Sequence, residues 1–123
     1  MIHGGNCTVF VSDMDKAVDF YTNVLGLKLR RRFDNNWAEV EAGPDLMIGL
    51  HPATDKAPAP GTPGSIHIGL TVTEPLETVM GTLAERGVEF VSPVVADEPG
   101  RFVFLHDPDG HVIYLWEHAS APV

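Results

Sequence analysis

The chain has 123 residues, of which 44% are apolar and 20% are charged, and this composition predicts one globular domain that is soluble. Lys and Arg number 8 and Asp and Glu number 17, so the formal net charge is −9. This acidic balance argues against nucleic acids and anionic membranes as partners, because both attract basic surfaces. The sequence has neither an apolar run of the roughly 20 residues that span a membrane nor the pattern of a signal peptide at its start. We therefore expect a cytoplasmic protein.

The first 51 residues predict a strand, a helix and three further strands. Residues 6–11 alternate between two faces, which is typical of a strand. Ser12 is expected to cap the N-terminus of the helix, and Gly26 is expected to end it. The next three strands are predicted at residues 27–33, 37–41 and 46–51. Cys7 is expected to be a buried, unreactive thiol on the helix-facing side of the first strand.

Residues 65–118 repeat this plan. A helix is predicted with Pro75 in its first turn and Gly87 at its end. Gly26 and Gly87 are 61 residues apart, and so are Asn6 and His67, which indicates an internal duplication. The strands of this second half are predicted at residues 65–72, 88–95, 102–106 and 112–117.

The fold class that follows is α+β, with two βαβββ modules in one domain that covers residues 1–123. The first module comprises residues 1–51 and the second comprises residues 65–118. The proline-rich segment between them, residues 52–64, is expected to be a stiff linker. Four strands with one helix leave one sheet face uncovered, so we expect the two modules to form a curved eight-stranded sheet with a concave pocket.

Several short motifs carry a resemblance to a known family. They are Val11-Ser12-Asp13, the sequence AVDFY at 17–21, VLG at 24–26, and FLHDPDG at 104–110. With the duplicated plan, the chain resembles the vicinal oxygen chelate superfamily, which contains glyoxalase I, extradiol dioxygenases and the bleomycin- and fosfomycin-resistance proteins. The resemblance implies the same fold. It also implies a homodimer, since the family often pairs modules between chains.

The resemblance further implies four metal-ligating positions on the concave face, two in each module. In this sequence they are Asn6, Gly49, His67 and Tyr114. Only His67 matches the family pattern, because glycine has no side chain and a neutral phenol is a poor ligand for a divalent metal. We therefore expect no metal and no other cofactor. The alternative is an unconventional divalent metal site made by His67, His51 and Glu39.

Strand alternation indicates which side chains line the pocket. Aromatic faces suit planar or cationic molecules, and the net charge of −9 favours neutral or cationic ones. Tyr114 and Glu39 are candidates for a catalytic acid or base. The predicted ligand-binding residues are Asn6, Phe10, Trp37, Gly49, His51, His67, Tyr114 and Trp116.

These features favour a small-molecule binding protein of the bleomycin-resistance type, which would sequester an aromatic or amphipathic compound without the usual metal. The alternative is a divergent metal-dependent glyoxalase-like lyase or isomerase, or a dioxygenase. A third hypothesis is a metal-free enzyme that uses Tyr114 or Glu39.

The remaining polar residues have simpler predicted roles. Asp107 and Asp109 are attributed to a tight turn rather than to a calcium site. Arg30 and Arg32 are expected either to be solvated or to hold a substrate carboxylate. The histidines expected in solvent are His3, His106, His111 and His118.

Overall fold

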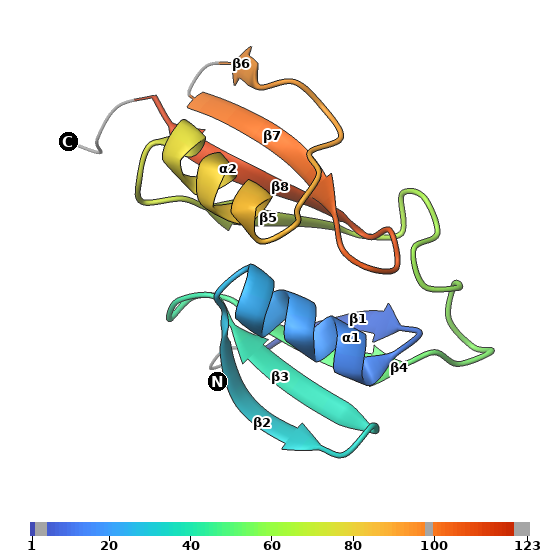
Figure 1. Ribbon diagram of the computed structural model, residues 1–123. Helices are drawn as coiled ribbons and strands as arrows, with labels where there is room; N and C mark the ends of the chain where they lie inside the picture. The colour runs from blue at the N-terminus through green and yellow to red at the C-terminus, as the bar shows by residue number, and fades with distance from the viewer. Residues whose placement is uncertain (2–4, 98–99, 120–123) are drawn as a thin grey trace.

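The computed structural model describes residues 1, 5–97 and 100–119, and it contains two βαβββ modules in succession (Figure 1). The elements of the first module are β1 (Cys7–Val11), α1 (Met14–Asp19), a π-helical turn (Phe20–Val24), β2 (Lys28–Phe33), β3 (Trp37–Glu41) and β4 (Met47–Pro52). Those of the second are β5 (His67–Thr71), α2 (Leu76–Glu85), β6 (Val95–Asp97), β7 (Gly100–His106) and β8 (Val112–His118).

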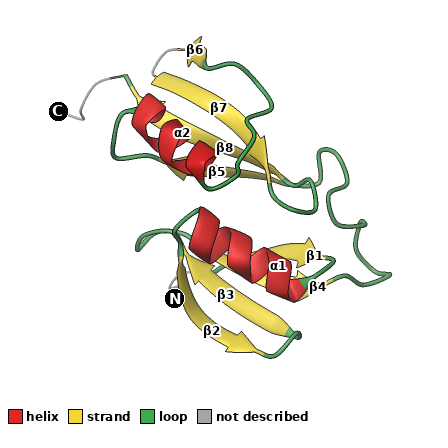
Figure 2. Ribbon diagram, viewed as in Figure 1, coloured by secondary structure: helices red, strands yellow, loops and turns green. Residues whose placement is uncertain are grey.

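Each module forms its own four-stranded sheet. The strand orders are β1-β4-β3-β2 and β5-β8-β7-β6, and one pair in each sheet is parallel. Both helices cover the same side of the molecule, so the opposite sheet faces are free of helices (Figure 2). The α+β fold of two βαβββ modules is confirmed. The predicted eight-stranded sheet, however, is divided in two, because β1 and β5 are each the edge strand of a separate sheet.

Alternation along the strands explains the layers. In β3 the side chains of Ala38 and Val40 are buried between partly exposed neighbours, and in β8 Ile113 and Leu115 are buried in the same way. These side chains join the apolar faces of the helices in a single core cluster. Burial of such branched and aliphatic side chains is the main favourable contribution to folding. The side chains of the other sheet face are left to form the candidate site.

Three local predictions were wrong at the strand and helix ends. Asp13, not Ser12, caps α1, because its side chain accepts a hydrogen bond from the Lys16 backbone N–H at 3.1 Å. Cys7 is exposed, since the burial of β1 begins only at Val9. Pro75 directly precedes α2 and does not lie in its first turn.

The predicted strand at 88–95 was also wrong. Within it Phe90 forms one isolated bridge with Leu105, and β6 begins only at Val95. Pro93 lies inside this segment and has no backbone N–H to donate to a ladder, which explains the interruption.

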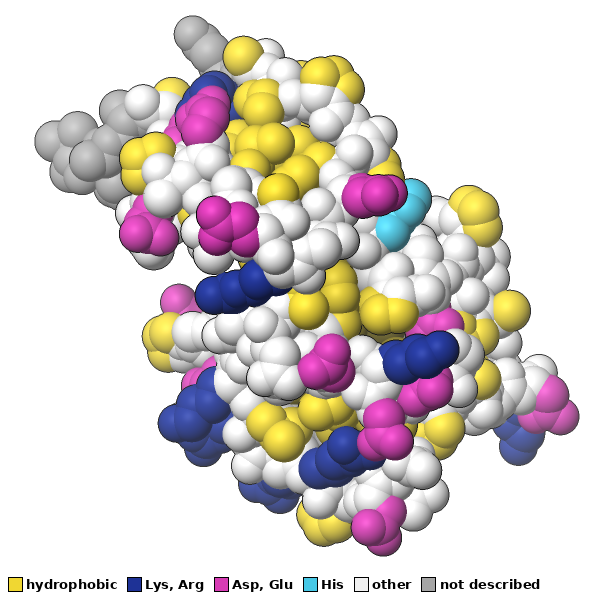
Figure 3. Space-filling model, viewed as in Figure 1, with side chains coloured by type: hydrophobic (Ala, Val, Ile, Leu, Met, Phe, Trp, Pro, Cys, Tyr) yellow, Lys and Arg dark blue, Asp and Glu magenta, His cyan; other side chains and the backbone are white. Residues whose placement is uncertain are grey.

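Acidic and basic side chains are interspersed around small apolar areas on the helix-covered face (Figure 3). Among the described residues, no helix has the length and apolar character needed to cross a bilayer.

Gly61 of the linker contacts the β7–β8 hairpin. Its backbone N–H donates a hydrogen bond to Nε2 of His111 at 3.3 Å. Gly61 has a φ of +80°, and a Cβ at this position would overlap the carbonyl oxygen of Asp109. Gly64 has a φ of +79° with no atom near its missing side chain. Only Gly61 therefore needs glycine both for its backbone conformation and for close contact.

We predict that Gly61→Ala destabilises the protein more than Gly64→Ala. Both changes place a side chain at positive φ, which costs about 1 kcal/mol. Gly61→Ala also forces the linker away from the hairpin, for about 1–3 kcal/mol more. Urea unfolding of both variants measures the difference. Equal losses would show that the linker does not press on the hairpin.

Candidate functional site

The face of the second module that is free of helices contains an aromatic cavity of about 460 Å³. The rings of Phe102 and Trp116 are stacked with centroids 6.0 Å apart, and those of Phe104 and Tyr114 lie 5.9 Å apart. All four rings come from β7 and β8, whose alternate residues point to this face. The lining residues are His67, Gly69, Thr71, Phe102, Phe104, Tyr114 and Trp116. A mostly apolar wall with a few polar groups suits an organic molecule.

The ring of Tyr114 packs closely against Gly69. The two residues are register partners in the parallel pair β5–β8, and a Cβ on Gly69 would overlap the Tyr114 ring. The absence of a side chain at Gly69 therefore sets the position of this ring in the floor of the cavity.

The first module repeats this arrangement on its own free face. Trp37 of β3 covers Gly49 of β4, where a Cβ would overlap the indole ring. The ring centroid of His51 lies 6.2 Å from that of Trp37 and 5.5 Å from that of Phe10. This face therefore has an aromatic row across three strands beside a glycine.

The structure divides the eight predicted ligand-binding residues between the two modules. The cavity in the second module contains His67, Tyr114 and Trp116. The other five lie in the first module: Asn6, Phe10, Trp37, Gly49 and His51. Sequence reasoning missed Phe102 and Phe104, although their alternation with Val103 and Leu105 was a signal that could have found them.

Two of the four positions that correspond to the family's metal ligands, Gly49 and Tyr114, are taken up by aromatic packing. At Gly49 the Trp37 ring occupies the space that a ligating side chain would need, and Tyr114 is packed on Gly69. The alternative trio of His67, His51 and Glu39 was not found together. Within the described ranges 1, 5–97 and 100–119, donor atoms of three such residues converge only at Asp107, Asp109 and His111.

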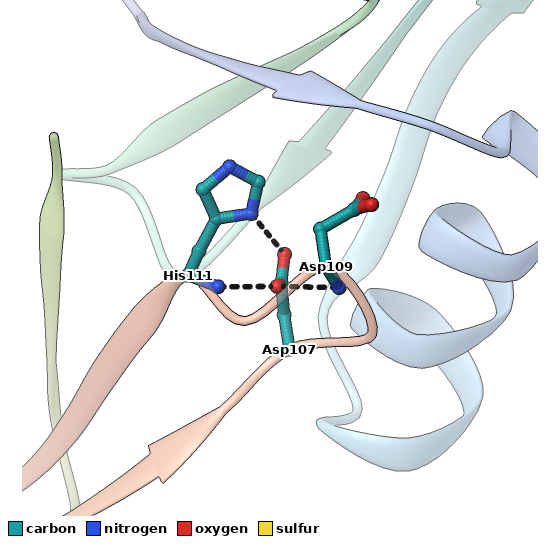
Figure 4. Close-up of side chains that lie close together, drawn as sticks. All are labelled: Asp107, Asp109 and His111. Atoms are coloured by element: carbon teal, nitrogen blue, oxygen red, sulfur yellow. Dashed lines mark hydrogen bonds and ion pairs between the residues drawn. The ribbon is translucent and has the colours of Figure 1, made fainter. Parts of the chain in front are cut away.

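The residues of that cluster are engaged in hydrogen bonds within the protein (Figure 4). Asp107 Oδ1 accepts hydrogen bonds from the backbone N–H groups of Asp109 and His111, at 3.0 and 2.8 Å. Asp107 Oδ2 lies 2.8 Å from His111 Nδ1 and accepts a bond from the Tyr21 hydroxyl at 2.9 Å. The carboxylate of Asp109 instead accepts hydrogen bonds from Ser12. Because these side chains already make hydrogen bonds within the protein, the cluster is a structural junction between the two modules.

His111 is buried, with 4% of its surface exposed, so its predicted solvation was wrong. The missed signal is the turn itself, because it returns His111 to the Asp107 carboxylate. His106 and His118 are exposed as predicted, whereas His3 lies outside the described residues.

The junction changes the protonation of its members. Burial, and then the charge and hydrogen bond of Asp107, raise the pKa of Tyr21 well above its usual value, so its hydroxyl remains a donor. Burial alone would lower the pKa of His111, but the hydrogen bond and charge of Asp107 together with the charge of Asp109 outweigh it and raise that pKa.

Of the two alternatives for the arginine run, the inward-facing pair of Arg30 and Arg32 is not formed. Arg32 bonds Asp15 of α1 at 2.6 Å, on the helix-covered side, and Arg30 lies 3.4 Å from Glu41. A shift in the β2–β3 register between Leu29 and Arg31 makes Arg31 the partner of Glu39.

We predict a pH-dependent contribution of His111 to stability. Because folding raises its pKa, the contribution is complete below the unfolded value of about 6.5 and is lost as pH rises through the folded value. The unfolding free energy of the protein relative to His111→Gln should therefore fall as pH increases through this range. Urea unfolding at several pH values measures it, with exposed His106→Gln as the control. Parallel profiles for the protein and His111→Gln would contradict the assignment.

Comparison with known proteins agrees with the fold and the duplicated plan. Residues 5–115 match the Glyoxalase/Bleomycin resistance protein/Dioxygenase superfamily. The chain belongs to this superfamily, and the resemblance seen in the sequence is confirmed.

The relatives include both enzymes and a binding protein. Lactoylglutathione lyase of Escherichia coli O157:H7 is 30% identical over 90% of this chain and 89% of its own length. A probable chloroplastic lactoylglutathione lyase of Arabidopsis thaliana is also 30% identical, but the chain spans only 35% of that protein. The crystal structure of TnmS3, an antibiotic binding protein from Streptomyces sp. CB03234, matches with 30% identity and a TM-score of 0.79 over 96% of this chain and 97% of that one.

Proposed function

We propose that this protein binds and sequesters a small aromatic or amphipathic molecule, without a resident metal, in the cytoplasm. The observation that carries the proposal is the cavity of about 460 Å³ walled by Phe102, Phe104, Tyr114 and Trp116. Offset and edge-on contacts with such rings favour a planar molecule beyond the area that it buries. The likeness to an antibiotic binding protein over nearly the whole chain supports this choice.

The metal positions also support binding rather than glyoxalase chemistry. Metal-dependent isomerisation needs about three protein ligands and a base beside the substrate. Here Gly49 is covered by Trp37, and Tyr114 is packed against Gly69. A lyase or isomerase that used this site would need a different set of ligands.

An enzyme is the second candidate, and two observations favour it. Lactoylglutathione lyases are among the relatives at 30% identity. His67 and Tyr114 both line the cavity, where either side chain could exchange a proton with a bound molecule.

We further propose that the protein is a homodimer. The cavity is lined by residues of the second module, while the aromatic row of Phe10, Trp37 and His51 lies on the first module. Pairing the first module of one chain with the second module of another would close the cavity with these rings. Light scattering of the purified protein measures the oligomeric state, and a strictly monomeric protein that binds its ligand would contradict this proposal.

We predict that a screen of planar aromatic compounds finds a binder with a Kd in the micromolar range or tighter. Phe102→Ala should weaken that binding by roughly tenfold or more, because it removes a wall of the cavity. Isothermal titration measures both affinities. Phe33→Ala is the control, since Phe33 is exposed on β2 and is not part of the lining. Failure of a broad screen at high concentration would contradict the proposal.

We also predict that the protein purifies without stoichiometric nickel, zinc, iron or manganese. Elemental analysis after growth with each metal tests this expectation. Stoichiometric metal that is lost in His67→Ala would overturn the proposal in favour of the enzyme, and His106→Ala is the matched control because His106 is an exposed histidine.

A further inference from the structure

Glu39 has an oxygen without a hydrogen-bond partner on the free face of the first module. Its Oε2 is buried, and among the described residues it is the buried side-chain oxygen that lacks a donor. The other oxygen, Oε1, lies 3.5 Å from Nε of Arg31. The side chain of Arg31 is 64% exposed and that of Glu39 only 17%. The guanidinium therefore extends into water, and only one of the two carboxylate oxygens has a partner. A buried acceptor without a donor is costly, and such groups are rare in folded proteins.

The strand register shows what surrounds this carboxylate. Glu39 lies directly across from Gly49, and Gly49 pairs in turn with Thr8 of β1. The Trp37 ring lies over Gly49, so it is next to Glu39. The neighbouring row contains Trp37, His51 and Phe10. A polar row with a carboxylate thus runs alongside an aromatic row.

His51 provides a second acceptor on the same face. Its Nδ1 lies 2.7 Å from the carbonyl oxygen of Pro52, and a carbonyl only accepts, so Nδ1 must carry the proton. In the neutral ring Nε2 is then a bare acceptor, and among the described residues it has no hydrogen-bond partner. This face therefore offers two acceptors to a bound molecule, the buried Oε2 of Glu39, which lacks a donor, and Nε2 of His51.

We infer that the first-module face is a subsite for a protonated amine on an aromatic molecule, with the Glu39 carboxylate as its anchor. This inference rests on the proposed binding function and names the class of its ligand. An ammonium group supplies N–H donors and a charge opposite to that of Glu39. The faces of Trp37 and Phe10 attract cations, and the net charge of −9 raises their local concentration. Because Oε2 is buried, an amine reaches it only when a neighbouring side chain moves aside.

The test compares two probes with the same ring system, para-phenylbenzylamine and para-phenylbenzyl alcohol. The amine is charged at neutral pH and the alcohol is not. We expect the amine to bind the full-length protein at least tenfold more tightly than the alcohol by isothermal titration. We expect Glu39→Gln to reduce this preference to about onefold. Glu41→Gln, which removes the next carboxylate on the same strand, should retain the preference.

The chain's two tryptophans assign the site to a module. In Trp116→Phe the emission comes from Trp37 alone, and the amine should change it. In Trp37→Phe the emission comes from Trp116 in the other module, and the amine group itself should add little to the change that the alcohol causes. A change confined to Trp116 would overturn the assignment to the first module.

Each remaining outcome has a distinct meaning. Equal affinity of the unaltered protein for both probes overturns the inference even if Glu39→Gln fails to fold, and it leaves the aromatic-binding function standing. A preference for the amine that persists in Glu39→Gln also overturns it. Binding of neither probe, together with a failed aromatic screen, overturns the proposed function as well.

Discussion

The buried carboxylate of Asp107 is the interaction on which the arrangement of the two modules depends. It accepts the Tyr21 hydroxyl from the first module, the imidazole of His111 and two backbone N–H groups of its own turn. Gly61 of the linker then donates to the far side of the same imidazole. The Asp107 carboxylate therefore connects the helical segment of the first module with the β7–β8 hairpin and, through His111, with the linker. A buried charge is tolerated when it is fully hydrogen-bonded in this way.

The Asp107 cluster also affects the position of the candidate site. β8 begins at Val112, directly after His111, and β8 contributes Tyr114 and Trp116 to the cavity. The hairpin that Asp107 holds is thus the starting point of the strand that carries half of the aromatic wall. The duplicated plan supplies the rest, because each free sheet face has a glycine under an aromatic ring, Gly49 under Trp37 and Gly69 under Tyr114. In the first module this pairing takes the place of a ligating side chain.

Much of the fold was predictable from periodicity. The alternation in β3 and β8, and the glycines with φ of +78° at Gly26 and +91° at Gly87, follow from local backbone and burial rules that a single sequence displays. The interrupted segment around Pro93 and the exposure of Cys7 were not predicted. Both depend on where a strand finds a partner and where the core begins, which are tertiary properties.

The candidate site was only half predictable. Alternation placed the side chains of His67, Tyr114 and Trp116 on the correct face of the sheet. It could not show that the cavity is lined by residues of the second module alone. The role of His111 was hidden for another reason. The turn brings its partner Asp107 close in sequence, but the Tyr21 hydroxyl that completes the buried cluster lies 86 residues from Asp107, and only folding brings it there. Likewise, no local sequence pattern predicts the register shift in β2 that makes Arg31 the partner of Glu39.

The position of Cys7 has a practical consequence for spectroscopy. It is the only cysteine in the chain, and it is exposed at the first residue of edge strand β1. A maleimide spin label would therefore attach once per polypeptide, at the border of the first module. In the proposed homodimer, dipolar coupling between the two nitroxides would measure the distance between the two β1 strands. No cysteine would have to be introduced.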